Sequence, residues 1–188
     1  MKKYLILIKH SLPEIVESLP AHEWRLSDEG RVRAQRLAEQ LTPFHPEAIF
    51  SSIEPKAKET AAIIASRYNL ELYVADGLHE HDRSTTPFLS TDQFQAAIRE
   101  FFEKPDTLVF GSETADEAYT RFSTAVNTVR KNYANETIVI VSHGTVIALL
   151  VSRLLGISDL LIWSELGLPS YVVFDMRKNT LITRKNFV

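Results

Sequence analysis

Two histidines, His10 and His143, stand at the ends of short apolar stretches of the chain, at residues 4–8 and 137–141. Continuous apolar runs of this length, rich in β-branched residues, are typical of strands buried on both faces. Lys9 stands immediately before His10. A histidine with a free nitrogen lone pair is a nucleophile, and a neighbouring cation favours an anionic substrate. These residues therefore indicate nucleophilic chemistry on an anionic group.

Further polar residues stand at, or shortly after, the ends of the predicted strands. They add hydroxyls, a second lysine, an acid and a glycine: Ser11, Ser51, Ser52, Lys56, Glu80 and Gly144. Cations beside an imidazole disfavour its protonation, so Lys9 and Lys56 would keep His10 neutral near neutral pH. Glu80 has the chemistry to protonate a leaving oxygen and then to accept a proton from water. Together with the N-terminus of the helix after His143, this set suits phosphoryl transfer.

Predicted strands and helices alternate along the chain. The strands are expected at 4–8, 48–50, 70–74, 137–141, 171–175 and 181–187, and the helices at about 28–41, 55–68, 91–104, 115–133 and 145–156. This alternation predicts an α/β fold, a three-layer α/β/α sandwich with a mainly parallel sheet. A hairpin through residues 177–179 would add an antiparallel edge strand. Because ligands bind at the carboxyl ends of parallel strands, we expect the polar residues to gather there.

The 188 residues fit a single domain, 1–188, with no internal repeat or linker. Residues 84–110 add no predicted strand. We expect them to form an insertion, or lid, over the strand ends.

Composition excludes several classes of protein. The net charge is −3 with both signs mixed along the chain, which argues against a nucleic-acid or polybasic membrane surface. The chain has no cysteine, so disulfides, zinc–thiolate sites and thiol catalysis are excluded. No apolar stretch reaches membrane-spanning length. A soluble, cytoplasmic protein acting on a small substrate is expected, and no oligomeric state is predicted.

Six motifs occur in the order in which one known family has them. They are Lys9-His10-Ser11, Leu26-Ser27-Asp28-Glu29-Gly30 with Ala34, Ser51-Ser52 with Lys56-Ala57 and Thr60-Ala61, Leu78-His79-Glu80, Gly111-Ser112-Glu113 with Asp116 and Arg121, and Ser142-His143-Gly144. The sequence resembles the histidine phosphatase superfamily, which includes cofactor-dependent phosphoglycerate mutases and many small phosphatases. The resemblance implies a phosphoglycerate mutase-like fold and no cofactor.

The resemblance also implies roles for individual residues. His10 would be the nucleophile that becomes phosphohistidine, and Glu80 the proton donor. Lys9, Lys56 and His143 would hold the phosphoryl oxygens.

Three departures from the family pattern concern the phosphate pocket. The two lysines replace arginines, and lysine keeps the charge but loses the planar fork that fits phosphate. Ser11 replaces a glycine, and its hydroxyl is a candidate phosphate donor. Arg83 is a candidate for the missing guanidinium.

The sequence therefore favours a phosphomonoester hydrolase with weakened activity. The alternative is an inactive relative that binds a phosphorylated ligand or a protein partner. A mutase is less favoured because the chain is short. Residues 79–82, His-Glu-His-Asp, superficially resemble a metal cluster, but no further ligands stand at a recognised spacing, so no metal is predicted.

Overall fold

The fold is built on a mixed sheet with the strand order β3-β2-β4-β1-β5-β6. The computed structural model describes residues 2–178 and 180–186. Its strands are β1 (Tyr4–Lys9), β2 (Ala48–Ser51), β3 (Leu72–Val74), β4 (Ile138–Ser142), β5 (Ser170–Asp175) and β6 (Thr180–Asn186). Strands β1 to β4 run parallel, whereas β5 is antiparallel to β1 and to β6. The predicted α/β fold with a mainly parallel sheet and an antiparallel edge is confirmed. Asn179 of the predicted hairpin and Phe187 of the predicted last strand lie outside the described residues.

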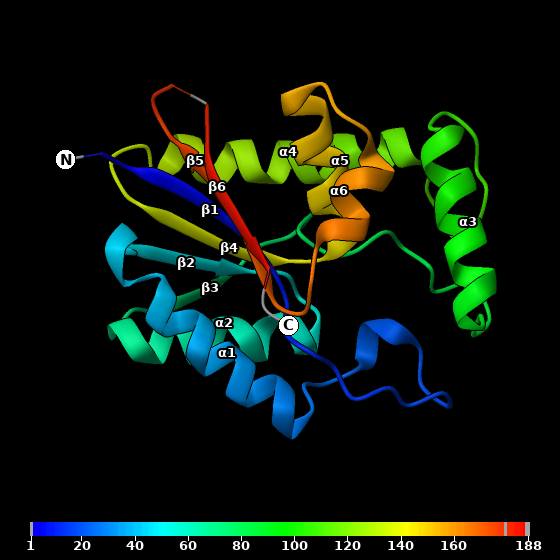
Figure 1. Ribbon diagram of the computed structural model, residues 1–188, viewed down its shortest axis with the longest axis horizontal. Helices are drawn as coiled ribbons and strands as arrows, with labels where there is room; N and C mark the ends of the chain where they lie inside the picture. Colours follow the sequence, from blue (N-terminus) through cyan, green and yellow to red (C-terminus); the bar gives the residue numbers. More distant parts are fainter. Residues whose placement is uncertain (1, 179, 187–188) are drawn as a thin grey trace.

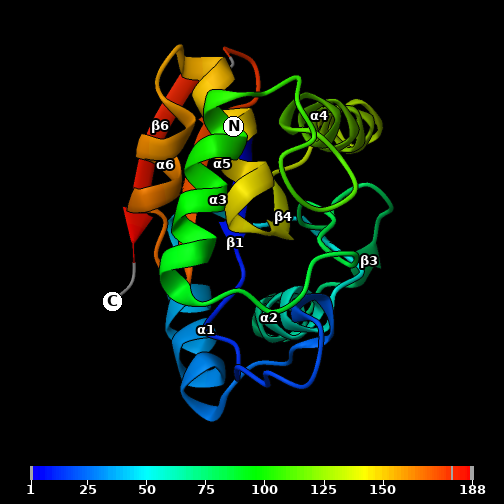
Figure 2. The ribbon, with the colours of Figure 1, turned by 90° about the vertical axis from the view of Figure 1, so that its right-hand side faces the viewer.

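Helices cover both faces of this sheet (Figures 1 and 2). They are α1 (Asp28–Gln40), α2 (Pro55–Tyr68), α3 (Thr91–Glu103), α4 (Ala115–Asn132), α5 (Gly144–Leu155) and α6 (Asp159–Glu165). Helices α1 and α2 pack on one face, and α4, α5 and α6 lie on the other. The arrangement is the predicted three-layer sandwich.

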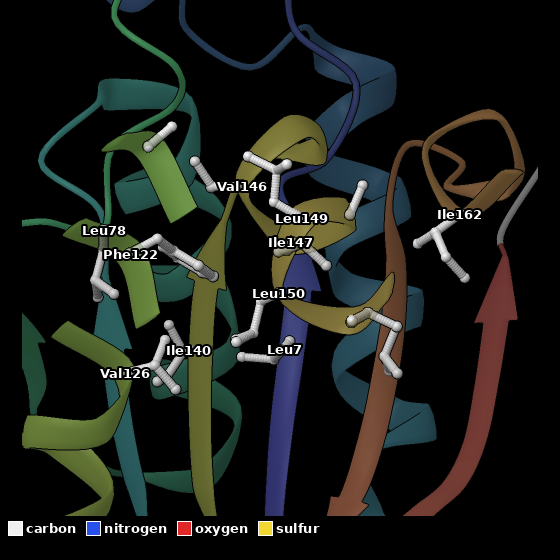
Figure 3. Close-up of a cluster of buried hydrophobic side chains, with 14 of the residues drawn as sticks. Leu7, Leu78, Phe122, Val126, Ile140, Val146, Ile147, Leu149, Leu150 and Ile162 are labelled. Carbon is white, nitrogen blue, oxygen red and sulfur yellow. The ribbon is translucent and has the colours of Figure 1, made fainter. Parts of the chain in front are cut away.

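The alternation of side chains along β1 explains why both faces must be covered. Leu5 and Leu7 point into one apolar cluster, and Ile6 and Ile8 into the other. Helices α4 and α5 supply many side chains of the first cluster, and those of α5 pack over β1 and β4 (Figure 3). This packing fixes the position of the N-terminus of α5, where the second histidine lies.

Helix starts follow the sequence closely. Residues 90–93 and 114–117 have the spacing of capping boxes in the sequence, and the structure forms both, at Ser90 and at Thr114. Ser27 Oγ accepts the N–H of Gly30. Helix α6 was not predicted, because its seven residues are too few for a clear apolar period.

Residues 84–110 contain α3 and the loops around it, and no strand is described within them. Helix α3 contacts α6. The function of this segment as a lid remains a prediction. Within the described residues, no helix has both the length and the apolar character needed to cross a membrane.

Candidate active site

Both predicted histidines lie at the carboxyl ends of neighbouring parallel strands. His10 follows β1, and its backbone N–H donates to Ser142 O of β4 at 2.9 Å. His143 follows β4 and is the N-cap residue of α5. The centroids of the two imidazole rings are 5.2 Å apart and the rings are inclined at 61°. The parallel pairing of β1 and β4 therefore brings together two side chains that are far apart in the sequence.

A cavity of about 990 Å³ lies over these strand ends. Its walls come from the loops after β1, β2 and β3 and from residues of α3, α5 and α6. Of the predicted site residues, four line it: Lys9, His10, Glu80 and Arg83.

The imidazole of His10 has a defined tautomer. Its Nδ1 lies 2.7 Å from Ser11 O, and a carbonyl oxygen only accepts, so Nδ1 carries the proton and Nε2 the lone pair. Burial lowers the pKa of His10 well below its usual value, and the charges of His143 and Lys56 act in the same direction. His10 is therefore neutral and nucleophilic at neutral pH.

His143 is fully buried and held by the loop after β2. Its Nε2 lies 2.8 Å from Ser52 Oγ and 3.3 Å from Glu54 Oε1. Burial lowers the pKa of His143 well below its usual value, and the Lys56 charge adds to this effect. These contacts fix the orientation of the ring beside His10.

Glu54 is a site residue that the sequence did not indicate. Its buried carboxylate lies 2.5 Å from Lys56 Nζ and accepts the backbone N–H of Glu80 at 2.8 Å. With its contact to His143, this one acid connects three of the predicted site residues. The available signal was a carboxylate shortly after a strand and at the N-cap position of the helix that follows.

The ammonium group of Lys56 already has hydrogen-bond partners within the protein. Besides Glu54, its ammonium donates to Ala21 O at 2.7 Å, and the residue is buried. It is not among the described residues that line the cavity. A direct contact with phosphate would require the ammonium to exchange one of these partners.

Lys9 reaches the cavity. Its Nζ donates to Leu166 O at 2.8 Å, and its chain passes close to Gly144, where an added Cβ would lie 3.1 Å from Lys9 Cε. Burial lowers the pKa of Lys9 to about 8, while the Glu80 carboxylate acts in the opposite direction. The ammonium is thus a cation at neutral pH and becomes neutral in mildly alkaline solution.

Glu80 lies against the N-terminus of α5. Its carboxylate accepts the backbone N–H groups of His81, Thr145 and Val146 at 2.9, 3.2 and 3.3 Å. Burial alone would raise the pKa of Glu80, but His143 and the other favourable charges and hydrogen bonds outweigh it and lower the pKa. Glu80 is therefore a carboxylate at neutral pH.

Arg121 of α4 holds the loop that carries Glu80. Its guanidinium donates to the carbonyl oxygens of Gly77, His79 and Glu80 at 2.8, 2.9 and 3.1 Å. It also pairs with Glu113, with Nε 3.0 Å from Oε2. The motif containing Glu113 and Arg121 was noted in the sequence, and the structure shows that it orients the acid-bearing loop.

Comparison with known families agrees with this arrangement. The model of the histidine phosphatase superfamily (branch 1) matches residues 7–185. The chain belongs to the histidine phosphatase superfamily.

Two curated relatives show the range of this superfamily. Phosphoserine phosphatase 1 of Hydrogenobacter thermophilus is 30% identical over 165 residues, which are 84% of this chain and 78% of the relative. Phosphoglycerate mutase-like protein 4 of Arabidopsis thaliana is 32% identical over 136 residues, which are 68% of this chain and 59% of that protein.

Solved structures share the fold. Phosphoserine phosphatase of Entamoeba histolytica, in complex with 3-phosphoglyceric acid, superposes with a TM-score of 0.80 at 22% identity, covering 98% of each chain. Mycobacterial glucosyl-3-phosphoglycerate phosphatase superposes with a TM-score of 0.75 at 21% identity, covering 98% of this chain and 97% of the other. The predicted phosphoglycerate mutase-like architecture is confirmed.

Arg83 and Ser11, the two auxiliary candidates for phosphate binding, have different surroundings. The Arg83 guanidinium lies 4.7 Å from the centroid of the Phe94 ring and lines the cavity. Its charge lowers the pKa of Glu80, so it acts on the site. Ser11 is fully buried, and its hydroxyl donates to Gly30 O at 2.7 Å. That hydroxyl proton is therefore not available to a phosphate in this conformation.

The side chains of the His-Glu-His-Asp loop, residues 79–82, have different surroundings. His81 packs against the rings of Phe101 and Phe110, with ring centroids 4.3 and 4.7 Å apart. In the part of the chain that the structure describes, no three His, Asp or Glu side chains are placed to hold a metal ion.

The lowered pKa of Lys9 makes phosphate affinity pH-dependent. As pH rises through about 8, the ammonium loses its proton, so competitive inhibition by inorganic phosphate is expected to weaken by about tenfold. Lys9→Arg keeps its charge and should hold the inhibition constant steady to higher pH. Exposed Lys58 offers the matched control, Lys58→Arg, which should behave like the wild type. The same alkaline weakening in Lys9→Arg would contradict the assignment.

Proposed function

We propose that the chain is a phosphomonoester hydrolase that works through a phosphohistidine on His10. The observation that carries the proposal is the tautomer of His10, whose Nδ1–H donates to Ser11 O and leaves the lone pair on Nε2. That nitrogen belongs to a ring lining the same cavity as Glu80 and two cations, Lys9 and Arg83.

The first chemical step transfers the phosphoryl group to His10. Its Nε2 forms a bond to phosphorus while the P–O bond to the leaving group breaks. Because Glu80 is a carboxylate at neutral pH, we infer that the proton enters with the monoanionic substrate and passes through Glu80 to the leaving oxygen.

The second step returns the enzyme to its starting state. Water attacks phosphorus, the P–N bond breaks, and Glu80 accepts the proton that water loses. Glu80 passes this proton to the departing inorganic phosphate, so that Glu80 is again a carboxylate and His10 is again neutral. Lys9 and Arg83 balance the charge on the phosphoryl oxygens, since both line the cavity with His10.

Weakened activity is part of the proposal. Each replacement of an arginine by lysine removes about one charge-assisted hydrogen bond, about 1.5–3 kcal/mol, or roughly 10- to 100-fold in rate. The ammonium groups of Lys9 and Lys56 already donate to protein carbonyl oxygens, those of Leu166 and Ala21. This observation favours the second candidate function, a protein that binds a phosphorylated ligand without turning it over.

Turnover of p-nitrophenyl phosphate separates the two functions. We expect slow release of p-nitrophenol and, after rapid quenching, a phosphoryl label that is stable to alkali and lost in acid, as phosphohistidine is. With an alkyl phosphate, whose leaving oxygen needs a proton, the rate should fall as pH rises above the second pKa of the substrate, about 6, because the monoanion supplies that proton. Phosphate binding without turnover or label would overturn the hydrolase and leave the binding function.

A further inference from the structure

Large apolar side chains surround the outer part of the catalytic cavity. Four that line it are well exposed to solvent: Ile15 (64%), Leu19 (41%), Ile53 (50%) and Phe88 (53%). They come from three separate segments, namely the loop after β1, the loop after β2 and the 84–90 stretch before α3. Exposed apolar side chains that converge on one cavity mark a surface that binds an apolar group.

The aromatic side chains deeper in the wall extend this apolar surface. Trp24, Phe94 and Trp163 are partly buried and line the same cavity. A volume of about 990 Å³ is far more than a phosphoryl group needs. Most of the space is therefore available to the group that the phosphate esterifies.

The charges lining the cavity have a defined arrangement. Among the described lining residues, the only lysine and arginine are Lys9 and Arg83, and both act at the phosphoryl end. The loop after β1, which supplies Ile15 and Leu19, instead adds two exposed acids, Glu17 and Glu23. His22, on the same loop, lies 3.7 Å from the Glu23 carboxylate.

A second anionic group on a substrate would therefore meet acids rather than cations. The carboxylate of a phosphorylated hydroxy acid or amino acid would be placed near Glu17 and Glu23 without a lysine or arginine partner among the described lining residues. An uncharged apolar group has no such penalty and would cover the exposed side chains.

We propose that the substrates are phosphate monoesters of uncharged, apolar alcohols, whose hydrocarbon part lies against Ile15, Leu19, Ile53 and Phe88. This inference rests on the proposed hydrolase function and specifies its substrate class. The phosphoryl group lies at His10, and the apolar part points toward the mouth of the cavity.

Two primary-alcohol esters test the substrate class without a large difference in leaving-group chemistry. Hexyl phosphate carries an apolar chain, whereas glycerol 3-phosphate is polar and equally uncharged beyond its phosphate. Each buried methylene contributes about fourfold, so kcat/KM for hexyl phosphate should exceed that for glycerol 3-phosphate by about tenfold or more. 3-Phosphoglycerate, with its carboxylate, should be the poorest of the three.

The variant Phe88→Ala tests where the apolar group of the substrate lies. Its loss of apolar surface should lower the ratio of the two kcat/KM values, hexyl phosphate over glycerol 3-phosphate, by about three- to tenfold. The matched control is Leu108→Ala, since Leu108 is 58% exposed and lies outside the described cavity lining. That control should keep the wild-type ratio.

The outcomes distinguish this inference from the proposed function. Hydrolysis of all three esters with a ratio near one, or with 3-phosphoglycerate preferred, would overturn the substrate class and leave the hydrolase intact. An unchanged ratio in Phe88→Ala would overturn the placement of the apolar group. Absence of hydrolysis of every ester, and of p-nitrophenyl phosphate, would overturn the hydrolase itself.

Discussion

Replacing His10 with alanine is expected to lower turnover of p-nitrophenyl phosphate by at least about 10⁴-fold, the size of loss that follows removal of an enzyme nucleophile. The nucleophilic nitrogen disappears, and neither His143 nor the lysines replace it, because His143 is fully buried and its Nε2 is engaged with Ser52. The acid-labile phosphoryl label should disappear together with turnover. Steady-state rates and rapid-quench labelling measure the two effects independently.

His45 offers a matched histidine control. It lies in an exposed loop away from the cavity, with a positive φ of 52°. Asparagine tolerates this left-handed conformation, so His45→Asn should fold and keep wild-type turnover and labelling. Phosphoryl label that persists in His10→Ala would show that a different residue is the nucleophile.

Glu80→Gln is expected to lower kcat by roughly 10²- to 10⁴-fold on alkyl phosphates, the range for loss of a general acid–base group. The amide oxygen can still accept backbone N–H groups at the start of α5, so the loop should keep its position. The loss should be much smaller for p-nitrophenyl phosphate, because p-nitrophenolate leaves without protonation. Kinetics on the two ester types measure this difference.

Asp82 is the neighbouring carboxylate that serves as a control. Hydrogen bonds from Ser84 lower the pKa of Asp82 to about 2, so its carboxylate is a weak acceptor for the proton that the reaction must transfer. Asp82→Asn should therefore cost much less than Glu80→Gln on alkyl phosphates. A larger loss in Asp82→Asn, or equal losses of Glu80→Gln on both ester types, would show that Glu80 is not the proton-transfer group.

Local sequence patterns predicted most of the fold. Apolar runs predicted the buried strands, and the capping boxes at Ser90 and Thr114 placed two helix starts correctly. Parallel pairing of β1 with β4 then required the residues after both strands to meet at one edge. The proximity of His10 and His143 is therefore a consequence of the strand pattern and the ladder register.

The contacts of the charged side chains could not be predicted in this way. Lys56 was expected to hold phosphate, yet its ammonium lies between the Glu54 carboxylate and Ala21 O. Arg121 was part of a recognised motif, but its three carbonyl partners on the loop after β3 emerge only when α4 packs beside that loop.

The sequence by itself determined the family, the α/β architecture and the strand ends that carry His10 and His143, because hydrophobic period and motif order are local properties of the chain. Tertiary structure alone decided that Glu54 joins Lys56, His143 and the Glu80 loop, and that apolar side chains from three loops meet around one cavity. The interactions of charged side chains depend on distance and burial, and both are set by segments that are remote in the sequence.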